Sequence, residues 1–174
     1  MSGVHFYDEV FEKDLSRFLL ANSRKALTEG HEFTRSNFQW DARIRQSSAV
    51  VLVRDIGAVV GSLILDALEK RTMISHRDYC VMNYAWTRLS HIPWHDDSRW
   101  EEAITIYLNE TWEPDWGGLF LYREQQGEIR GYSPVFNSGL KNLGKVSHST
   151  TPVMMDAPEP RFTLQLFTAR TKPA

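Results

Sequence analysis

The sequence has very little cysteine, since Cys80 is the only one among 174 residues. A single thiol excludes an intrachain disulfide and is natural for a protein of a reducing compartment. Long apolar runs are also missing, because the longest, residues 56–65, is too short to span a bilayer. The N-terminus carries acidic residues where a secretory signal needs a positive charge and an apolar core. We therefore expect a cytoplasmic protein without a membrane partner.

Neither sign of charge is in large excess. Lysine and arginine number 20 against 22 acidic residues, so the net charge is −2 and the isoelectric point about 6.3. The basic residues are scattered, which leaves no electrostatic footprint for nucleic acid, and we expect no such partner. Hydrophobic residues make up 42% of the sequence and aromatic residues 12%. This composition is typical of a globular protein, and the length suits one domain.

Two segments near the N-terminus have apolar residues at helical spacing. Residues 8–30 predict one helix, with Asp8 as its cap and Gly30 as its stop, and residues 55–71 predict another. Their apolar faces comprise Phe11, Leu15, Phe18 and Leu19 in the first and Val60, Leu63, Ile64, Ala67 and Leu68 in the second. Residues 47–54, between them, fit either a strand or a loop that enters the core. We expect residues 1–77 to be a mainly helical support region.

From about residue 78 the period of the pattern changes to two. Residues 79–86, 102–110, 117–124 and 161–169 are strand-like. The last of them alternates Phe162, Leu164 and Leu166 with Arg161, Thr163 and Gln165. Each strand thus has an apolar face and a face with selected polar groups. This favours a barrel with a polar site inside it or a sandwich with one wet face, and periodicity does not separate the two. The predicted fold class is mainly β with N-terminal helices (α+β).

The stretch "HIPWHDDSRW", residues 91–100, holds a candidate metal-binding pair. If it is extended, His95 and Asp97 point to the same side, because side chains alternate along a strand. His91 lies four residues before His95, but Pro93 between them and the lack of an HExxH glutamate argue against a zincin site. His148 is then the candidate third ligand. Two histidines and one carboxylate leave coordination positions open, which is the arrangement for non-haem Fe(II) and oxygen.

Each part of this constellation also fits ordinary surface residues. A His-x-Asp pair occurs by chance in many proteins, and a histidine before a strand is often only hydrogen-bonded. The order along the chain favours a site, because Arg161 follows His148 on a polar strand face. A buried arginine is costly unless it meets an anion, and a dicarboxylate co-substrate would provide one.

At these residues the chain resembles the Fe(II)/2-oxoglutarate-dependent dioxygenases, in particular their prolyl-hydroxylase-like branch. The matching segments, within residues 79–167, are "NYAWTRLSHIPWHDD", "AITIYLNETWEPDWGGLFLY", "FNSGLKNLGKVSHSTTPV" and "RFTLQLF". The resemblance implies a double-stranded β-helix, a jelly-roll or cupin-like barrel packed against helices. It implies a single domain over residues 1–174, with residues 78–170 as the catalytic core.

The resemblance also implies a role for individual residues. His95, Asp97 and His148 would hold Fe(II). The residues that would bind 2-oxoglutarate are Arg161, Tyr107, Thr163 and Tyr84. The two tyrosines also fit a core position with a satisfied hydroxyl. The interval between His148 and Arg161 is longer than the compact spacing of the family, so Lys145 and Arg170 are alternative cations.

The implied activity is hydroxylation of an unactivated carbon in an amino-acid or peptidyl (prolyl-type) side chain. The co-substrates would be 2-oxoglutarate and O2, the co-products succinate and CO2, with ascorbate as a supporting reductant. The alternatives are a natural-product tailoring oxygenase acting on a small molecule and a non-catalytic sensor domain that binds metal and 2-oxoglutarate. Candidate substrate residues are Trp86, Arg88 and Trp94. Residues 123–134 fit either a lid or a solvated hairpin loop.

Overall fold

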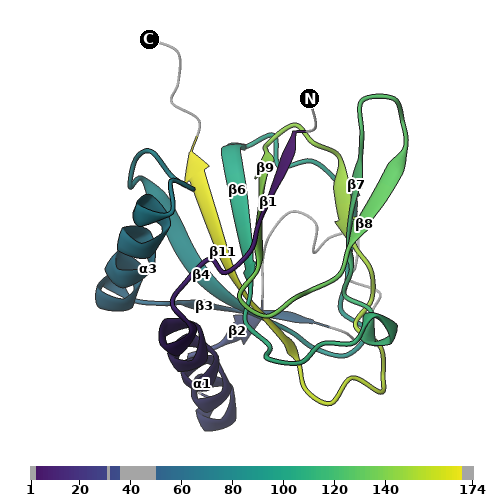
Figure 1. Ribbon diagram of the computed structural model, residues 1–174. Coiled ribbons are helices and arrows are strands. Elements are labelled where there is room, and N and C mark those ends of the chain that lie inside the picture. Colours follow the sequence, from purple (N-terminus) through teal and green to yellow (C-terminus); the bar gives the residue numbers. More distant parts are fainter. Residues whose placement is uncertain (1–2, 31, 36–49, 170–174) are drawn as a thin grey trace.

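The computed structural model describes residues 3–30, 32–35 and 50–169 (Figure 1). The larger of its sheets contains β1 (Val4–Tyr7), β2 (Thr34–Arg35), β3 (Val51–Asp55), β4 (Tyr79–Trp86), β6 (Trp100–Tyr107), β9 (Gly139–Leu143) and β11 (Arg161–Ala169). The smaller contains β5 (Ile92–His95), β7 (Phe120–Arg123), β8 (Ile129–Tyr132) and β10 (His148–Thr150). The helices are α1 (Lys13–Glu29), α3 (Ala58–Lys70) and the short 3-10 helix η1 (Pro114–Trp116).

The strands form an antiparallel sandwich with helices on one side. The major sheet has the order β1-β9-β6-β11-β4-β3-β2, and the minor sheet has the order β5-β10-β7-β8. Helices α1 and α3 lie on the side of the major sheet away from the β7–β8 hairpin (Figure 1). The predicted class, mainly β with helices in the first half of the chain, is confirmed. In the described part of the chain, no helix combines the length and apolar character needed to cross a bilayer.

The first helix ends at the residue that the sequence predicts, but it begins later in the chain than predicted. Gly30 adopts a left-handed conformation with φ 72°, and its N–H donates to the carbonyl of Ala26. The cap predicted at Asp8 is wrong, because α1 begins after Glu12. The chain before it is engaged elsewhere: residues 4–7 pair with β9 as β1. His5, which falls within the region expected to be mainly helical, therefore lies in a strand.

Two residues of the predicted helical faces are exposed. Phe18 has 50% of its surface exposed and Leu63 has 49%. The buried stripe of α1 instead contains Leu19 and Leu20. Because each residue along a helix is rotated by about 100° around the axis, Phe18 lies beside this stripe and not in it. In α3 the buried stripe contains Ile64 and Leu68, and Leu63 lies one position outside it.

The N-terminal region contributes strands as well as helices. Residues 51–55 form β3, which pairs with β4, so the strand interpretation of the 47–54 segment holds for residues 51–54. Besides α1 and α3, the region expected to be mainly helical contains β1, β2 and β3, which extend the major sheet. His31, which also falls within the region expected to be mainly helical, lies outside the described residues.

The two faces of the major sheet differ as the alternation predicts. Ile104, Phe162 and Leu164 face the helices and are at most 1% exposed, which makes this layer the main apolar core. The opposite face carries Arg161 and Thr163, which are also nearly fully buried. Both faces are covered, so the sandwich with one wet face is excluded. The polar face encloses a site between the sheets.

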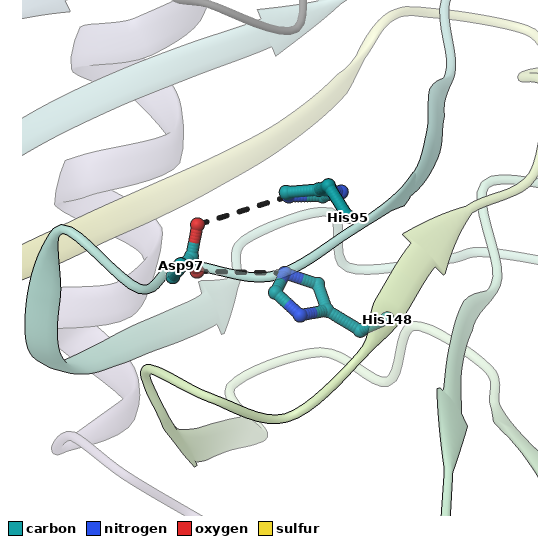
Figure 2. A group of neighbouring side chains, drawn as sticks. All are labelled: His95, Asp97 and His148. Carbon is teal, nitrogen blue, oxygen red and sulfur yellow. Dashed lines mark ion pairs between the residues drawn. The ribbon is translucent and has the colours of Figure 1, made fainter.

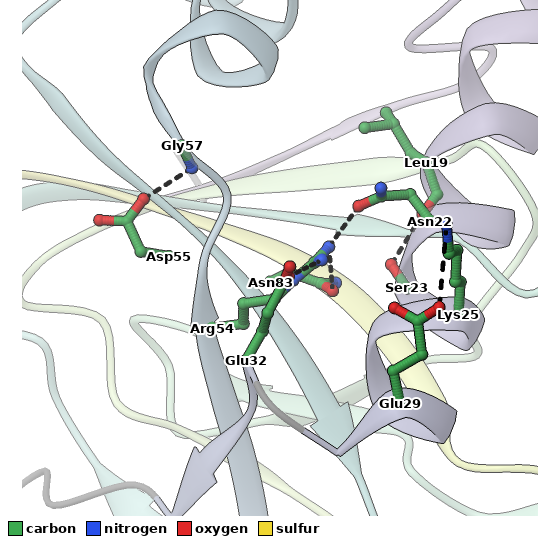
Figure 3. A network of polar contacts seen from close by, with 10 residues as sticks. All are labelled: Leu19, Asn22, Ser23, Lys25, Glu29, Glu32, Arg54, Asp55, Gly57 and Asn83. Carbon is green, nitrogen blue, oxygen red and sulfur yellow. Dashed lines mark hydrogen bonds and ion pairs between the residues drawn. The ribbon is translucent and has the colours of Figure 1, made fainter.

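A buried arginine ties α1 to the major sheet (Figure 3). Arg54, on β3, is 5% exposed. Its guanidinium donates to Asn22 of α1 at 2.6 Å and to Asn83 of β4 at 3.3 Å, and it pairs with Glu32 at 2.5 Å. Because Glu32 is mostly exposed, the charge of Arg54 is balanced from the solvent side. The helix is thereby held against the sheet by polar as well as apolar contacts.

Candidate metal centre and adjoining pocket

Three side chains with metal-ligating atoms meet between the sheets (Figure 2). His95 ends β5, His148 begins β10, and the two are directly paired across the strands. Their rings lie 4.3 Å apart, between centroids. The carboxylate of Asp97 faces both rings, at 3.7 Å from His95 Nε2 and 3.4 Å from His148 Nε2. One ligand atom from each residue lies within 4.8 Å of the others, a group that could hold a metal ion.

The backbone determines which ring nitrogen of each histidine faces this centre. His95 Nδ1 lies 2.8 Å from the carbonyl oxygen of Pro93, and His148 Nδ1 lies 2.8 Å from that of Val146. A carbonyl oxygen only accepts, so both Nδ1 atoms carry the proton. In the neutral rings both Nε2 lone pairs then point toward the Asp97 carboxylate. Lone pairs and an anion at this distance repel unless a cation lies between them, which is the arrangement of a metal site with an oriented second shell.

Protonation of the His95 imidazole, which would also place a positive charge beside Asp97, is disfavoured. Burial lowers the pKa of His95, and the neighbouring His148 lowers it further. Asp96, the adjacent carboxylate, is exposed and accepts a hydrogen bond from the backbone N–H of Ser98 at 3.0 Å. The hydrogen bonds from Ser98 lower the pKa of Asp96. Asp96 is therefore engaged at the surface and turned away from the centre.

The position of Asp97 has a different cause from the one inferred from the sequence. Strand β5 ends at His95, so Asp97 lies in the following turn and strand alternation does not place it. The turn is held by the Trp100 N–H, which donates to the carbonyl of Asp97 at 2.8 Å. Gly144 packs against it: a Cβ there would lie 2.0 Å from the carbonyl oxygen of Trp100 and 2.7 Å from that of Asp97. The glycine-rich segment before His148 thus allows two backbones to approach closely.

Arg161 lies in the same pocket without an acidic partner. Its side chain is 2% exposed, and its guanidinium carbon lies 4.4 Å from the ring centre of Trp86 and 5.7 Å from that of Tyr107. Nη1 donates to the carbonyl of Gly118, whereas Nε has no partner. Burial lowers the pKa of Arg161 to about 10, so it remains charged at neutral pH. Within the described ranges no carboxylate forms an ion pair with it, and such a buried cation calls for an anion.

The long interval before Arg161 is a folded loop. The N–H of Val153 donates to the carbonyl of Ser90, and the carbonyl of Val153 accepts from Leu89. Ala157 is fully buried. The loop therefore returns the chain to β11 with Arg161 inside the pocket. Of the alternative cations, Lys145 is exposed, and Arg170 lies outside the described residues.

The other expected co-substrate residues are buried near Arg161, in different ways. Tyr84 and Tyr107 line the pocket, each 2% exposed, and burial raises the pKa of both hydroxyls. Thr163 does not line it. Its hydroxyl accepts hydrogen bonds from Trp86 Nε1 at 3.0 Å and from Gln165 Nε2 at 3.3 Å. Thr163 thus positions the ring on which Arg161 stacks.

Of the three candidate substrate residues, only Trp86 lines the pocket. Arg88 is exposed and donates to the carbonyl of Ala157 at 3.0 Å. Trp94 lies under the guanidinium of Arg123, at 5.4 Å, and is not a lining residue. Within residues 123–134, residues 123–132 form a β-hairpin from the end of β7, a tight turn and β8, which corresponds to the hairpin loop expected as the alternative to a lid.

The pocket has a volume of about 510 Å³, including the part open to solvent. Its described lining residues are Tyr84, Trp86, Ile92, His95, Asp97, Ala103, Thr105, Tyr107, Phe120, Asn142, His148, Thr150, Arg161, Gln165 and Phe167. The sequence pattern places Gln165 on the polar face of its strand, but it does not identify Asn142, Phe120 and Phe167 as pocket residues. For the lining residues on β6 and β11, the alternation of side chains along each strand is the pattern that could identify them. The segment before His148 is irregular and has no pattern that would identify Asn142 as a pocket residue.

Solved structures share the fold of this protein across nearly the whole chain. A prolyl-4-hydroxylase from Pseudomonas putida superposes with a TM-score of 0.74 at 18% identity, over 99% of this chain and 95% of that one. The chain has the prolyl-hydroxylase fold. A prolyl hydroxylase from Trichoplax adhaerens, in complex with a hypoxia inducible factor peptide fragment, has a TM-score of 0.77 at 16% identity, over 97% and 84% of the two chains. The fold relationship implied by the resemblance is confirmed.

The prolyl-hydroxylase fold also occurs with other reactions. A non-heme alpha-ketoglutarate-dependent epimerase from nogalamycin biosynthesis has a TM-score of 0.67 at 11% identity, over 95% of this chain and 77% of that one. No family model matches the chain, and no curated protein matches it in sequence. The fold therefore does not define the reaction, which depends on the residues of the pocket.

Proposed function

We propose that this protein is an Fe(II)- and 2-oxoglutarate-dependent dioxygenase that hydroxylates an unactivated carbon of an amino-acid or peptidyl side chain. Its sheets would form a double-stranded β-helix, with residues 78–170 as the core of one domain. One observation carries the proposal. A single pocket holds two oriented imidazoles and a carboxylate, and also a buried arginine that has no acidic partner in the described residues.

The residues present fit the implied metal. His95 and His148 each present an Nε2 lone pair, and Asp97 adds the negative charge that a divalent cation needs. Nitrogen and carboxylate ligands suit Fe(II), and three protein ligands leave room for a co-substrate. Bound Fe(II) with 2-oxoglutarate and O2 supplies the oxidising chemistry, with succinate and CO2 as co-products.

The residues around Arg161 fit the distal carboxylate of 2-oxoglutarate. The unpartnered Nε of Arg161 offers a donor, and its positive charge would be neutralised by the diacid. Tyr107, under the guanidinium, presents a hydroxyl kept neutral by its raised pKa, so it can donate as well. Trp86 and Thr163 hold the guanidinium in place, and the guanidinium is nearly fully buried. Tyr84 is proposed as a further contact.

The test is the release of succinate from 2-oxoglutarate in the presence of Fe(II), ascorbate and O2. We expect Arg161→Ala to raise the KM for 2-oxoglutarate by about thirtyfold to near a thousandfold, the equivalent of about 2–4 kcal/mol for a lost charge-assisted pair. Lys145→Ala, which removes an exposed cation, is the matched control and should leave this KM unchanged. An unchanged KM in Arg161→Ala would reject the assignment of the anion site.

A screen for a mass gain of one oxygen would identify the substrate among amino acids, peptides and small natural products. The epimerase of similar fold is an observation in favour of the second candidate, a tailoring enzyme acting on a small molecule. Binding of metal and 2-oxoglutarate without any succinate release would instead indicate a sensor domain.

A further inference from the structure

Asn142 is a pocket residue that the proposed chemistry does not use. It lies on β9, is 2% exposed and lines the pocket. Its side-chain Nδ2 is buried and has no hydrogen-bond partner. An amide N–H in this situation loses its water without gaining another acceptor, which is unfavourable unless a ligand supplies one.

The neighbouring amide in the pocket is satisfied within the protein. Gln165 accepts from the hydroxyl of Thr105 at 2.9 Å and donates to that of Thr163 at 3.3 Å. These bonds leave Gln165 little capacity to bind a ligand. Asn142 is therefore the amide donor that the described part of the pocket leaves available.

The sheet register places Asn142 far from the anion end. Asn142 lies opposite Ala103 of β6, and Ala103 lies opposite Phe167 of β11. Phe167 follows Arg161 by six residues on the same strand, which corresponds to about 20 Å at about 3.3 Å per residue. 2-Oxoglutarate, a five-carbon diacid, is too short to reach both positions. Asn142 therefore belongs to the part of the pocket left for the substrate.

The charges of the pocket define what this donor can bind. Among the described lining residues, Asp97 and Arg161 are the charged ones, and the proposed function assigns both. The sheet register places the lining residues Ala103 and Phe167, which carry no charge, in line with Asn142. Among these three residues a substrate carboxylate would meet one neutral donor and no positively charged side chain, which is a costly burial. A neutral carbonyl oxygen would be matched.

We propose that Asn142 is a specificity-determining residue that donates a hydrogen bond from its side-chain amide to an uncharged carbonyl oxygen of the substrate. The enzyme therefore selects a carboxamide, ester or lactam over the corresponding free acid. This inference rests on the proposed function, since it takes the anion end to be filled by 2-oxoglutarate.

The experiment compares matched pairs of carboxamides and free acids, linear and cyclic, by succinate release from the Fe(II)-loaded protein. The wild type is expected to turn over the carboxamide of a pair in preference to the acid. Asn142→Ala should raise the KM for the carboxamide by about three- to tenfold, the value of one neutral hydrogen bond, and leave the KM for 2-oxoglutarate unchanged. Leu143→Ala, an exposed position on the same strand, is the control and should behave as the wild type. An unchanged carboxamide KM in Asn142→Ala, or preference for the acid, would overturn the inference.

A second measurement does not depend on turnover. In 15N-labelled protein loaded with Zn(II) and 2-oxoglutarate, the Asn142 side-chain NH2 signals, assigned by their loss in Asn142→Ala, are followed during titration with N-methylacetamide or acetate. A saturable shift with N-methylacetamide and none with acetate supports the inference, and the absence of a shift with N-methylacetamide contradicts it. Failure of the wild type to bind metal or 2-oxoglutarate would reject the proposed function itself. If the wild type binds metal and 2-oxoglutarate but the Asn142 signals do not respond to N-methylacetamide, only this inference is rejected.

Discussion

At the scale of single residues, the two imidazoles of the candidate metal centre are oriented by main-chain carbonyls. His95 and His148 each donate Nδ1–H to the carbonyl two residues earlier. The tautomers are therefore built into the local backbone and do not depend on a neighbouring side chain. Asp97 differs, because its position depends on a turn and on the space left by Gly144. The carboxylate is thus the ligand whose placement is most easily disturbed.

The adjacent aspartates give a direct test of this assignment. Asp97→Asn removes the negative charge between the imidazoles and should weaken metal binding at least about tenfold, since the loss of even an outer-shell partner has that effect. Asp96→Asn should bind metal as the wild type does, because Asp96 is exposed and contacts Ser98. Titration with Mn(II) or Zn(II), followed by calorimetry, measures both. Weak binding in Asp96→Asn with normal binding in Asp97→Asn would reverse the assignment.

A pair of glycines tests how Arg161 is held. Gly118 has φ 66°, and a Cβ there would lie 3.0 Å from Arg161 Cδ. Gly118→Ala should therefore cost about 1–2 kcal/mol of stability for the left-handed backbone and also raise the KM for 2-oxoglutarate by moving Arg161. Gly127→Ala, in the β7–β8 turn, is the control, because its φ is 87° and nothing lies within 4 Å of its Cβ position. It should lose similar stability with an unchanged KM. Equal KM values in the two variants would contradict the contact.

At the scale of elements, α1 is joined to the start of β11 by a polar cluster. Arg24 of α1 donates twice to Glu159, at 2.7 and 2.8 Å. Asn109 donates to Glu159 at 2.9 Å and accepts from the N–H of Phe162 at 2.7 Å. Phe162 follows Arg161 directly. The cluster thus fixes the chain at the point where β11 enters the pocket.

We expect Glu159→Gln to lower the free energy of unfolding by about 1–2 kcal/mol, because it removes a charge-assisted pair that is half-buried. Lys25→Ala, which removes an exposed pair with Glu29 at 3.8 Å, should cost less than about 0.5 kcal/mol. Urea unfolding followed by circular dichroism measures both differences. Equal losses would show that the cluster adds nothing beyond an ordinary surface pair.

The pH dependence of the Glu159→Gln difference follows from the direction of the pKa shift. Burial raises the pKa of Glu159, but the hydrogen bonds from Arg24 and Asn109 outweigh it and hold the pKa below its ordinary 4.5. The folded pKa is thus below the unfolded one, so the stabilisation is fully present above pH 4.5 and is lost as the pH falls through the folded pKa. The wild type and Glu159→Gln should therefore converge in stability only in that acidic range.

At the scale of the whole molecule, the candidate site lies between the two sheets. His95 and His148 come from the minor sheet, Arg161 from the major sheet, and Asp97 from the chain that joins them. A metal ion with 2-oxoglutarate would therefore bind both layers together. Ligands that bind only the folded state stabilise it by mass action.

We expect a divalent metal at a hundredfold excess over its Kd to add about 2.7 kcal/mol, which raises Tm by about 5–10 °C for a chain of this size. 2-Oxoglutarate should raise Tm further, and only when metal is present. His148→Ala should show neither shift and keep a similar Tm without metal. His91→Ala is the control that keeps both shifts, since its Nδ1 contacts the carbonyl of Leu89 away from the site. Differential scanning calorimetry with Mn(II) measures these values. A full metal shift in His148→Ala would remove it from the centre.

Local pattern in the sequence determined much of this molecule. The period-two alternation showed which side chains of β11 lie on one face, so that Arg161 and Gln165 could be placed together, because strand geometry depends only on neighbours along the chain. The stop of α1 at Gly30 followed from the conformational freedom of glycine. The metal triad was proposed from residue types and their order, and the structure brings those three residues together.

Tertiary structure alone decided the features that depend on contacts between distant segments. Asp97 faces the histidines because a turn packs against Gly144, although the strand expected to place it ends at His95. Phe18 is exposed because only part of the apolar face of α1 meets the sheet. Whether a buried donor such as Asn142 Nδ2 finds an acceptor depends on what the other sheet places opposite it. Sequence periodicity gives the direction of a side chain, whereas burial and pairing are set by how the layers close on one another.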